Sequence, residues 1–228
     1  MVNDGIILKR INIFINPATY LRIRNEIDFH NKNVVVRYDS LVLWVISKLF
    51  QFIPGERGAF DMSSLAPQII QGCVEKKSAV LFVGGTFQDA LIFEQKLKSR
   101  YPKLNLLVKE GFQTDQKAIL ELVHRNSIKY FICGMGAPKQ ERLVTEIFAK
   151  TGIYCFTCGG FITQMAKADH TDYYPPLVVR LNIRFIYRLF KEPHVRMRLI
   201  DDYPRGIFFF IFDRFRQIVQ ANNYGRDR

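Results

Sequence analysis

The chain has 228 residues, of which 48% are hydrophobic and 24% are charged, and this balance is typical of a globular protein with a substantial core. No apolar run approaches the roughly 20 residues that span a bilayer, and residues 1–10 lack the apolar stretch of a signal peptide. We therefore expect a cytoplasmic protein. The net charge of +12 favours a partner that carries phosphates, whether a nucleotide, a nucleic acid or a lipid head group.

The N-terminal part of the chain predicts two strands, at residues 11–15 and 34–38, with a turn and a helix that starts at Asn16-Pro17 between them. A helix over residues 40–50 follows, and Pro54-Gly55 ends it. Asp39 stands between the second strand and this helix, where an aspartate often caps the helix.

Four further apolar runs each end at glycine, and segments whose apolar residues recur at helical spacing lie between them. The runs are 79–83 before Gly84-Gly85, 104–108 before Gly111, 130–133 before Gly134-Met135-Gly136, and 153–158 before Gly159-Gly160, with helical patterns at 87–100, 115–126 and 138–150. This alternation predicts an α/β fold with a Rossmann-like, mostly parallel sheet flanked by helices. Right-handed crossovers would bring the glycine turns to the one edge where open sheets bind ligands. Alternatively, each glycine serves only its local turn.

We expect one catalytic domain over residues 1–179, because no repeat or linker interrupts it, and a basic amphipathic appendage over 180–228. The appendage has eleven basic and five acidic residues. Arg180, Arg184, Arg188 and Lys191 recur at helical spacing beside an apolar row, which is typical of a helix on an anionic membrane surface. The apolar run 207–212 is too short to cross a bilayer. Alternatively, its aromatic residues dock on the domain and the arginines face solvent.

Cysteines supply one short motif, the pair Cys155-x-x-Cys158. A zinc site would need a second pair or histidines at ligand spacing, and a redox motif would open a helix. This pair continues an apolar strand into glycine, so we interpret it as structural.

The segment from Gly134 to Glu141 reads Gly-Met-Gly-Ala-Pro-Lys-Gln-Glu. It begins like a dinucleotide fingerprint, but Lys139 stands where the third glycine belongs, which disfavours a nicotinamide-dependent oxidoreductase. Pro138 suits the first position of a helix, and the start of that helix, with Lys139 and Gln140, could hold a diphosphate. A plain helix start explains the same residues.

This segment is similar to the signature of the WecG/TagA/CpsF glycosyltransferases (glycosyltransferase family 26). The resemblance runs from about Asn16 to Arg198. Residues 34–40 are similar to the family's strand that ends in Ala-Asp-Gly, and residues 57–61 are similar to its Arg-x-x-Gly-x-Asp element. Gly84-Gly85 is similar to its second glycine turn, and Gly111-Phe112 to its Gly-Tyr-Phe. Residues 187–193 are similar to its Tyr-Arg-Leu-x-x-Glu-Pro.

The resemblance implies an inverting, metal-independent transferase without a cofactor. It would move an N-acetylmannosamine-type sugar, a uronic acid or a hexose from a UDP-sugar to an undecaprenyl-diphosphate-linked sugar, in cell-surface polysaccharide synthesis. The implied partners are therefore the UDP-sugar, the polyprenyl-diphosphate-linked acceptor and the anionic inner-membrane surface, to which the enzyme would bind peripherally. Family members can associate through apolar surfaces, and the sequence leaves a homo-oligomer open. A basic nucleic-acid-binding module is the other alternative, but the chain has no helix-turn-helix, zinc-finger or RNP signature.

By the same resemblance, Asp39 is the general base of the transfer. Arg57 and Gln140, with amides of the glycine turns, would meet the charge on the departing UDP, and Asp61 would orient Arg57 or bind sugar hydroxyls. No Asp-x-Asp element follows a strand, so we predict no metal site. The other expected donor-binding residues are Asn16, Gly84, Gly85, Gly111, Phe112, Gly134, Gly136, Ala137, Pro138, Lys139, Glu141 and Gly160, and the expected acceptor-binding residues are Arg188, Arg196 and Arg198.

Three departures from the family pattern concern the identity of the donor sugar more than the type of reaction. Thr163 stands where Gly-Gly-x-Phe-Asp-Phe has its acid, Tyr38-Asp39-Ser40 replaces Ala-Asp-Gly, and Asn16-Pro17-Ala18 replaces Asn-x-Glu. They also leave open a weakly active or inactive relative.

Overall fold

The structure, a computed structural model, describes residues 10–112, 115–168, 178, 190 and 193–224. Its strands are β1 (Ile11–Ile15), β2 (Val34–Tyr38), β3 (Gly55–Arg57), β4 (Val80–Gly84), β5 (Leu106–Lys109), β6 (Tyr130–Gly134) and β7 (Tyr154–Thr157). Its helices are α1 (Pro17–Ile23), α2 (Leu41–Phe50), α3 (Leu65–Glu75), α4 (Phe87–Arg100), α5 (Gln116–Arg125), α6 (Lys139–Thr151), α7 (Phe161–Lys167) and α10 (Pro193–Tyr224).

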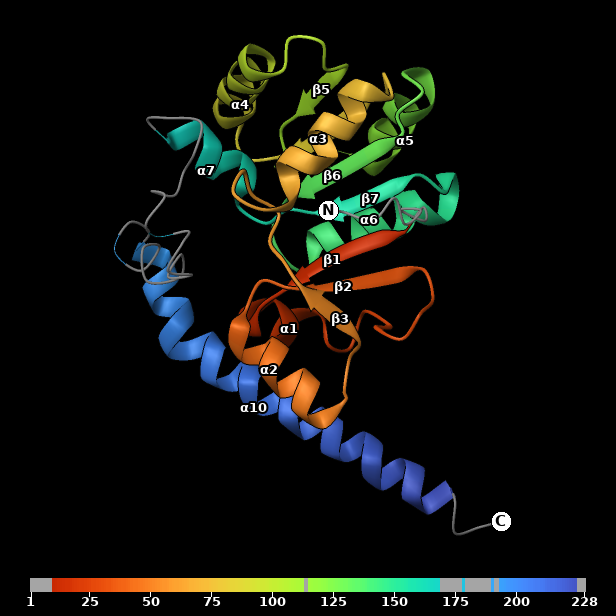
Figure 1. Cartoon of the computed structure of the whole chain (residues 1–228), viewed down its shortest axis with the longest axis vertical. Coiled ribbons are helices and arrows are strands. Elements are labelled where there is room, and N and C mark those ends of the chain that lie inside the picture. The colour runs from red at the N-terminus through yellow and green to blue at the C-terminus, as the bar shows by residue number, and fades with distance from the viewer. Residues whose placement is uncertain (1–9, 113–114, 169–177, 179–189, 191–192, 225–228) are drawn as a thin grey trace.

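All seven strands form one parallel sheet in the order β3-β2-β1-β7-β6-β4-β5 (Figure 1). The predicted α/β class and parallel sheet are therefore confirmed. Every strand ends at the same edge, so the residues that follow the strands gather there. Parallel strands need both faces covered, which explains their almost continuous burial.

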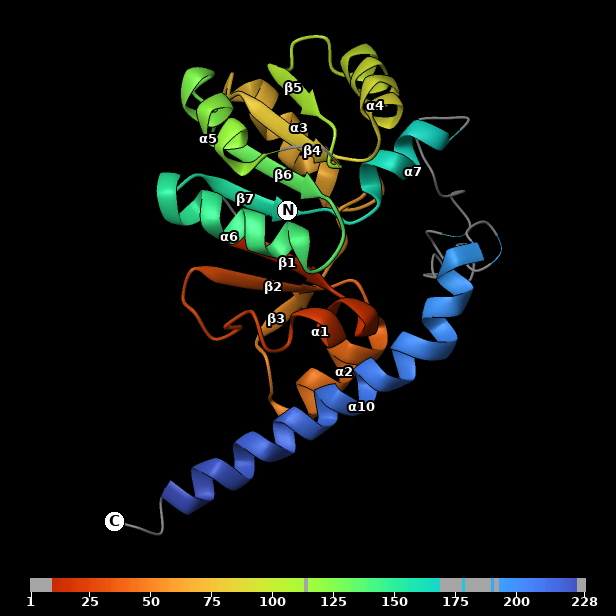
Figure 2. The same ribbon diagram turned by 180° about the vertical axis from the view of Figure 1, so that it is seen from behind.

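Helices cover both faces of the sheet and enclose two hydrophobic cores (Figures 1 and 2). One core lies under α1, α2, α5, α6 and α10, and it contains Ile13, Val83 and Phe131 from the strands. The other lies under α3, α4 and α7 and contains Phe82 and Phe156. The right-handed crossovers fix these sides, because connections that run in opposite directions place their helices on opposite faces.

The C-terminal helix α10 packs along α1 and belongs to the same core as the sheet (Figure 2). Phe210 is fully buried, with its ring 4.8 Å from that of Tyr20 and 4.9 Å from that of Phe52. Asp213 accepts hydrogen bonds from the Tyr20 hydroxyl (2.7 Å) and from the guanidinium of Arg24. The predicted boundary at 179/180 and the arginine stripe over 180–191 lie outside the described residues.

The apolar run 207–212 docks on the domain with one side of α10, as one of the two sequence hypotheses expected, while its other side faces the exterior. Ile207, Phe209 and Phe210 pack on the core, whereas Phe208 and Phe212 are exposed. In the described ranges, no helix has both the length and the apolarity needed to cross a membrane.

Candidate active site

Asp39 and Arg57 lie on neighbouring strands at the carboxyl edge of the sheet. Tyr38 is aligned with Ile15 of β1 on one side and with Arg57 of β3 on the other. The backbone N–H of Asp39 donates to the Ile15 carbonyl (2.9 Å), and that of Gly58 donates to the Tyr38 carbonyl (3.1 Å). Asp39 and Arg57 are both exposed, so a carboxylate and a guanidinium reach solvent at the ends of two adjacent strands.

The cap of α2 is Ser40, not Asp39. The Ser40 hydroxyl accepts from the Leu43 amide at 3.4 Å, and α2 begins at Leu41. The alternative that Asp39 serves as the helix cap is therefore wrong. Its carboxylate stands one residue before the cap, at the open end of the sheet.

Two other predicted residues of this region have local structural roles. Asn16 caps α1, because its Oδ1 accepts from the Thr19 amide at 3.0 Å. Oδ1 of Asp61 accepts from both the amide (2.9 Å) and the hydroxyl (2.7 Å) of Ser63. These bonds shape the loop that leads from Arg57 to α3, and the donor-binding roles of Asn16 and Asp61 stay predictions.

Strands β4 and β6 are neighbours whose chains leave in opposite directions, β4 through α4 to β5 and β6 through α6 to β7. Such a reversal is where open α/β sheets bind ligands. Gly84 and Gly134 are paired there, and a Cβ on Gly84 would lie 2.5 Å from the Gly134 carbonyl oxygen. A Cβ on Gly111 would lie 2.9 Å from Cα of Gly84. These glycines allow the backbone turns to pack closely, so sequence reasoning alone could not separate that role from ligand binding.

Gly136, in contrast, faces open space. Its φ is +78°, which favours glycine, and a Cβ built there meets nothing within 4 Å. The Ala137-Pro138 peptide bond is cis, and Pro138 occupies the N-cap of α6, one position before the first helical residue, Lys139, rather than the first helical position expected from the sequence. Lys139 is exposed at the first turn, where the positive end of the helix dipole favours an anion.

Gln140 and Glu141 are buried and bonded to each other. Gln140 Nε2 donates to Oε1 of Glu141 at 2.7 Å, and Gln140 Oε1 accepts from the Gly159 amide at 3.2 Å. The Gln140 amide therefore links the start of α6 to the glycine turn after β7.

Strands lie about 4.8 Å apart, so three strand steps separate β2 from β6 by about 14 Å. Gln140 and Asp39 could contact one ligand only if it extends across that distance.

Glu141 is the most strongly perturbed acid of this edge. Its side chain is fully buried, and Oε2 has no hydrogen-bond partner among the described residues. Burial raises the pKa of Glu141 to about 7, against the lowering effect of the Gln140 hydrogen bond. The carboxyl group is thus held partly protonated near neutrality and is shielded from solvent.

An acid that sequence reasoning missed lies beside Thr163. The Thr163 hydroxyl donates to Oδ2 of Asp89 at 3.2 Å, and that oxygen also accepts from the Thr86 amide at 3.1 Å. A Cβ on Gly85 would contact both Asp89 and Thr163. Asp89 therefore places a carboxylate next to the position where the family pattern has an acid on α7. The sequence signal that could have drawn attention to Asp89 was the Thr86-x-x-Asp89 spacing, which is typical of a capping box at the start of a helix.

Exposed aromatic residues flank the turns after β4 and β5. Phe112 is 79% exposed and Phe87 is 68% exposed. The Gly111 amide donates to the Gly85 carbonyl at 2.9 Å, which brings these two turns together. Phe87 was not expected from the sequence. Gly160, the N-cap of α7, is also exposed at this edge.

The expected acceptor arginines are only partly described. Arg188 lies outside the described residues, and Arg198 belongs to α10 without a described side chain. Arg196 is exposed in the first turn of α10. That end of α10 lies on the side of the molecule to which the strand arrows point (Figure 1).

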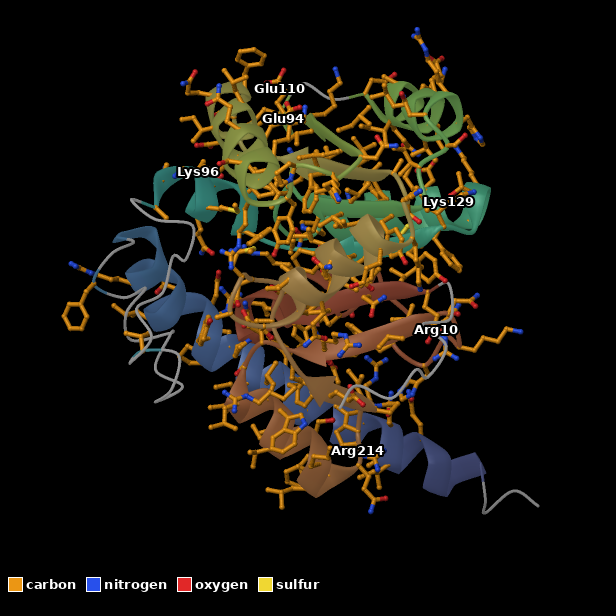
Figure 3. The ribbon with its side chains drawn as sticks, turned by 45° about the horizontal axis from the view of Figure 1, so that its top comes forward. Arg10, Glu94, Lys96, Glu110, Lys129 and Arg214 are labelled. Carbon is orange, nitrogen blue, oxygen red and sulfur yellow. The ribbon has the colours of Figure 1, made fainter. Side chains whose placement is uncertain are left out.

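Lys96 secures α7 to α4. Its Nζ donates to the carbonyls of Met165 (3.0 Å), Ala166 (3.0 Å) and Ala168 (2.6 Å), the last of which follows the helix (Figure 3). This satisfies carbonyls that a helix end leaves unpaired, so the C-terminal end of α7 is fixed against α4.

Residues 8–224 match the sequence model of the glycosyl transferase WecG/TagA/CpsF family. The chain belongs to this family. A relative from Shigella boydii, named UDP-Gal:alpha-D-GlcNAc-diphosphoundecaprenol beta-1,4-galactosyltransferase, is 28% identical over 218 residues, which cover 92% of this chain and 89% of the relative. A WecG/TagA/CpsF protein is a glycosyltransferase, so the oxidoreductase and nucleic-acid-binding alternatives are set aside.

Proposed function

We propose that this WecG/TagA/CpsF protein is an inverting transferase that needs no metal ion and moves a sugar from a UDP-sugar to an undecaprenyl-diphosphate-linked sugar. The observation that carries the proposal is the position of Asp39, which is exposed at the end of β2, is relieved of helix capping by Ser40 and lies one strand away from Arg57 of β3. The name of the Shigella boydii relative supports the two substrate classes.

In the proposed reaction, Asp39 accepts the proton of an acceptor hydroxyl while that oxygen bonds to the anomeric carbon. The bond from this carbon to the UDP oxygen breaks on the opposite face, so the configuration inverts and UDP leaves with the bonding electrons. Arg57 and backbone amides at the glycine turns meet the charge that develops on UDP. Gln140 acts as a positioning residue through its bond to the Gly159 turn.

The donor would extend along the carboxyl edge, from the reversal between β4 and β6 towards β2. Phe87 and Phe112 supply exposed aromatic faces for the uracil base. Asp89 and Thr163 offer a carboxylate and a hydroxyl that can bind sugar hydroxyl groups. A UDP-hexose such as UDP-galactose is the first donor to test, since the relative's name specifies UDP-Gal.

The acceptor stays in the bilayer, so the proposed enzyme works at the inner face of the cytoplasmic membrane. Residues 180–228, with Arg188, Arg196 and Arg198, would contact the acceptor diphosphate and the anionic surface. The proposed product is a lipid-linked intermediate of a surface polysaccharide.

The test is turnover of UDP-sugars with an undecaprenyl-diphosphate-linked N-acetylglucosamine acceptor, with the anomeric configuration of the product measured by NMR. Asp39→Asn should lower kcat by about 10²- to 10⁴-fold, the usual contribution of a general base. Asp28→Asn is the matched control, because Asp28 is exposed in the turn before β2, at the opposite edge of the sheet. Equal turnover of Asp39→Asn and Asp28→Asn would exclude Asp39 as the base.

A further inference from the structure

Asp89 is held on the first turn of α4 by hydrogen bonds that use only one of its two carboxylate oxygens. Oδ2 accepts from the Thr86 amide at 3.1 Å and from the Thr163 hydroxyl at 3.2 Å, whereas no described residue donates to Oδ1. A capping box explains the bond from Thr86 but not the bond from Thr163, which comes from another helix. Asp89 is half-buried and solvent reaches Oδ1. Oδ1 is therefore an acceptor with a fixed orientation and no partner among the described residues.

The turn after β4 is shaped so that this carboxylate can lie close to it. Gly85 has a φ of +69°, and a Cβ built there would lie 2.9 Å from Cβ of Asp89 and 3.2 Å from the Thr163 hydroxyl oxygen. A side chain at position 85 would push both groups away from the turn. Gly85 therefore allows two polar side chains of different helices to approach the carboxyl edge of the sheet.

Asp89 lies far along this edge from the residues proposed for the transfer chemistry. Four steps in the strand order separate β4 from β2, which corresponds to about 19 Å at the usual strand spacing. Asp39 follows β2, so the transferred sugar would lie at that end of the donor and the nucleoside at the other. The exposed rings of Phe87 and Phe112, proposed above to contact uracil, belong to the turns after β4 and β5. The part of the donor within reach of Asp89 is therefore the nucleoside.

The charge of Asp89 indicates which group of a nucleoside it would bind. A carboxylate only accepts hydrogen bonds, and within the described ranges no cation forms an ion pair with Asp89. Such a group repels a diphosphate. It also fits uracil poorly, because the N–H of that base lies between two carbonyl oxygens. The hydroxyls of ribose are neutral donors that lie side by side, and an acid binds them in dinucleotide-binding folds.

We propose that Asp89 is a specificity-determining residue that binds the ribose hydroxyls of the nucleotide donor, and that Thr163 positions its carboxylate. The donor class is then a ribonucleotide sugar and excludes deoxyribonucleotide sugars such as those of thymidine diphosphate. This inference rests on the proposed function for the presence of a UDP-sugar at this edge. It concerns the nucleoside alone, so it is independent of which sugar is transferred.

The experiment measures the affinities of UDP and deoxyuridine diphosphate (dUDP) for the full-length protein by isothermal titration calorimetry, without an acceptor. The wild type should bind UDP about 10- to 100-fold more tightly than dUDP, the usual effect of one hydrogen bond to a charged group. In Asp89→Asn the amide oxygen should take the position of Oδ2, because Thr86 and Thr163 both donate there. An NH2 group then replaces Oδ1, so the preference for UDP should fall by about tenfold.

Two further variants control for charge and for orientation. Glu94→Gln removes one acid from the same helix, and its carboxylate is bound to Lys98 at 2.6 Å, so this variant should keep the wild-type preference (Figure 3). Thr163→Val retains the charge of Asp89 but removes a bond that orients it, and it should lose a smaller part of the preference. The preference is a ratio of two affinities measured on one protein, so partial unfolding of a variant would not change it.

The outcomes separate this inference from the proposed function. Equal affinities of the wild type for UDP and dUDP, or an unchanged preference in Asp89→Asn, would overturn the role of Asp89 and leave the UDP-sugar donor in place. If Asp89→Asn loses the preference for UDP over cytidine diphosphate but keeps that over dUDP, Asp89 contacts the base and the inference is wrong. A wild type that binds none of these nucleotides would overturn the proposed function, and the inference with it.

Discussion

The hydroxyl groups of Tyr38 and Ser47 lie 2.9 Å apart in a buried hydrogen bond, and each lies within hydrogen-bonding distance of the Ile53 carbonyl (2.8 and 2.7 Å). Burial raises the pKa of Tyr38 to about 12, so its hydroxyl remains a donor at physiological pH. This network joins the end of β2 to α2 and to the loop before β3. It therefore fixes the backbone on both sides of Asp39.

Tyr38→Phe should lower the free energy of unfolding by about 1 kcal/mol, the usual net value of one hydrogen bond. Ser47→Ala should cost a similar amount, and the double variant should cost less than the two single changes together, because the hydroxyls share one network. Urea unfolding of the four proteins measures this. Strictly additive losses would show that the two hydroxyls act independently.

Arg57→Ala tests the proposed contact with the departing UDP. Turnover should fall by about 10²- to 10³-fold, the typical loss of one donor to a developing charge. The unfolding free energy should change little, since the Arg57 side chain is exposed. Arg125→Ala, an exposed arginine in the last turn of α5, is the control for removal of one cation and should keep full turnover. Unchanged turnover of Arg57→Ala would remove this residue from the mechanism.

The sequence predicted the buried strands, because burial on both faces of the sheet leaves a continuous apolar run. It also predicted longer helices, from the helical spacing of their apolar residues. Residues 11–15, 34–38 and 87–100 were predicted with the bounds that the structure has. Three elements were not predicted. β3 has only three residues, Gly-Glu-Arg, too few to show a period; α3 contains Pro67 and Gly72, which weaken a helical pattern, and α7 has only seven residues.

The site was predictable where residues follow predicted strands, since topology alone brings Asp39 and the glycine turns to one edge, whereas Arg57, on the unpredicted β3, was expected only from the family resemblance. It was less predictable where the role of a residue depends on packing. Gln140 was expected to face a ligand, yet its amide is buried against Glu141 and Gly159. Asp89 was overlooked, because its proximity to Thr163 depends on the contact between α4 and α7.

Glu141→Gln should flatten the pH dependence of stability. The folded pKa of about 7 lies above the ordinary value of 4.5, so between these values the unfolded chain binds fewer protons than the folded one. The wild type should therefore lose stability as the pH rises from about 4.5 to 7, by on the order of 3 kcal/mol in total. Glutamine keeps an oxygen that accepts from Gln140 and has no proton to lose.

Urea unfolding at pH 5 and pH 8 measures this difference. The wild type should lose stability between the two values, and Glu141→Gln should lose less and exceed the wild type at pH 8. Glu26→Gln serves as a comparison, because Glu26 raises the Glu141 pKa only as a minor contributor and bonds to Arg142 at the surface. An identical pH dependence in the wild type and Glu141→Gln would show that Glu141 is ionised in the folded protein.

Gly206 offers a test of how tightly α10 is joined to the domain. Replacing glycine by alanine inside a helix normally stabilises it by roughly 0.5–1 kcal/mol. At Gly206 the sign should reverse, because an added Cβ would lie 2.1 Å from the Pro17 carbonyl oxygen and 2.6 Å from its carbon. Backbone cannot yield as a flexible side chain does, so α10 must shift away from α1, with a net loss of about 1–3 kcal/mol.

Gly72 of α3 supplies the matched control, since a Cβ built there meets nothing within 4 Å. Gly72→Ala should raise the unfolding free energy while Gly206→Ala lowers it, in the same urea titration. Amide hydrogen exchange should then quicken in α10 and α1 of Gly206→Ala and stay unchanged in α3. If both substitutions stabilise the protein alike, α10 does not pack on α1 at this distance.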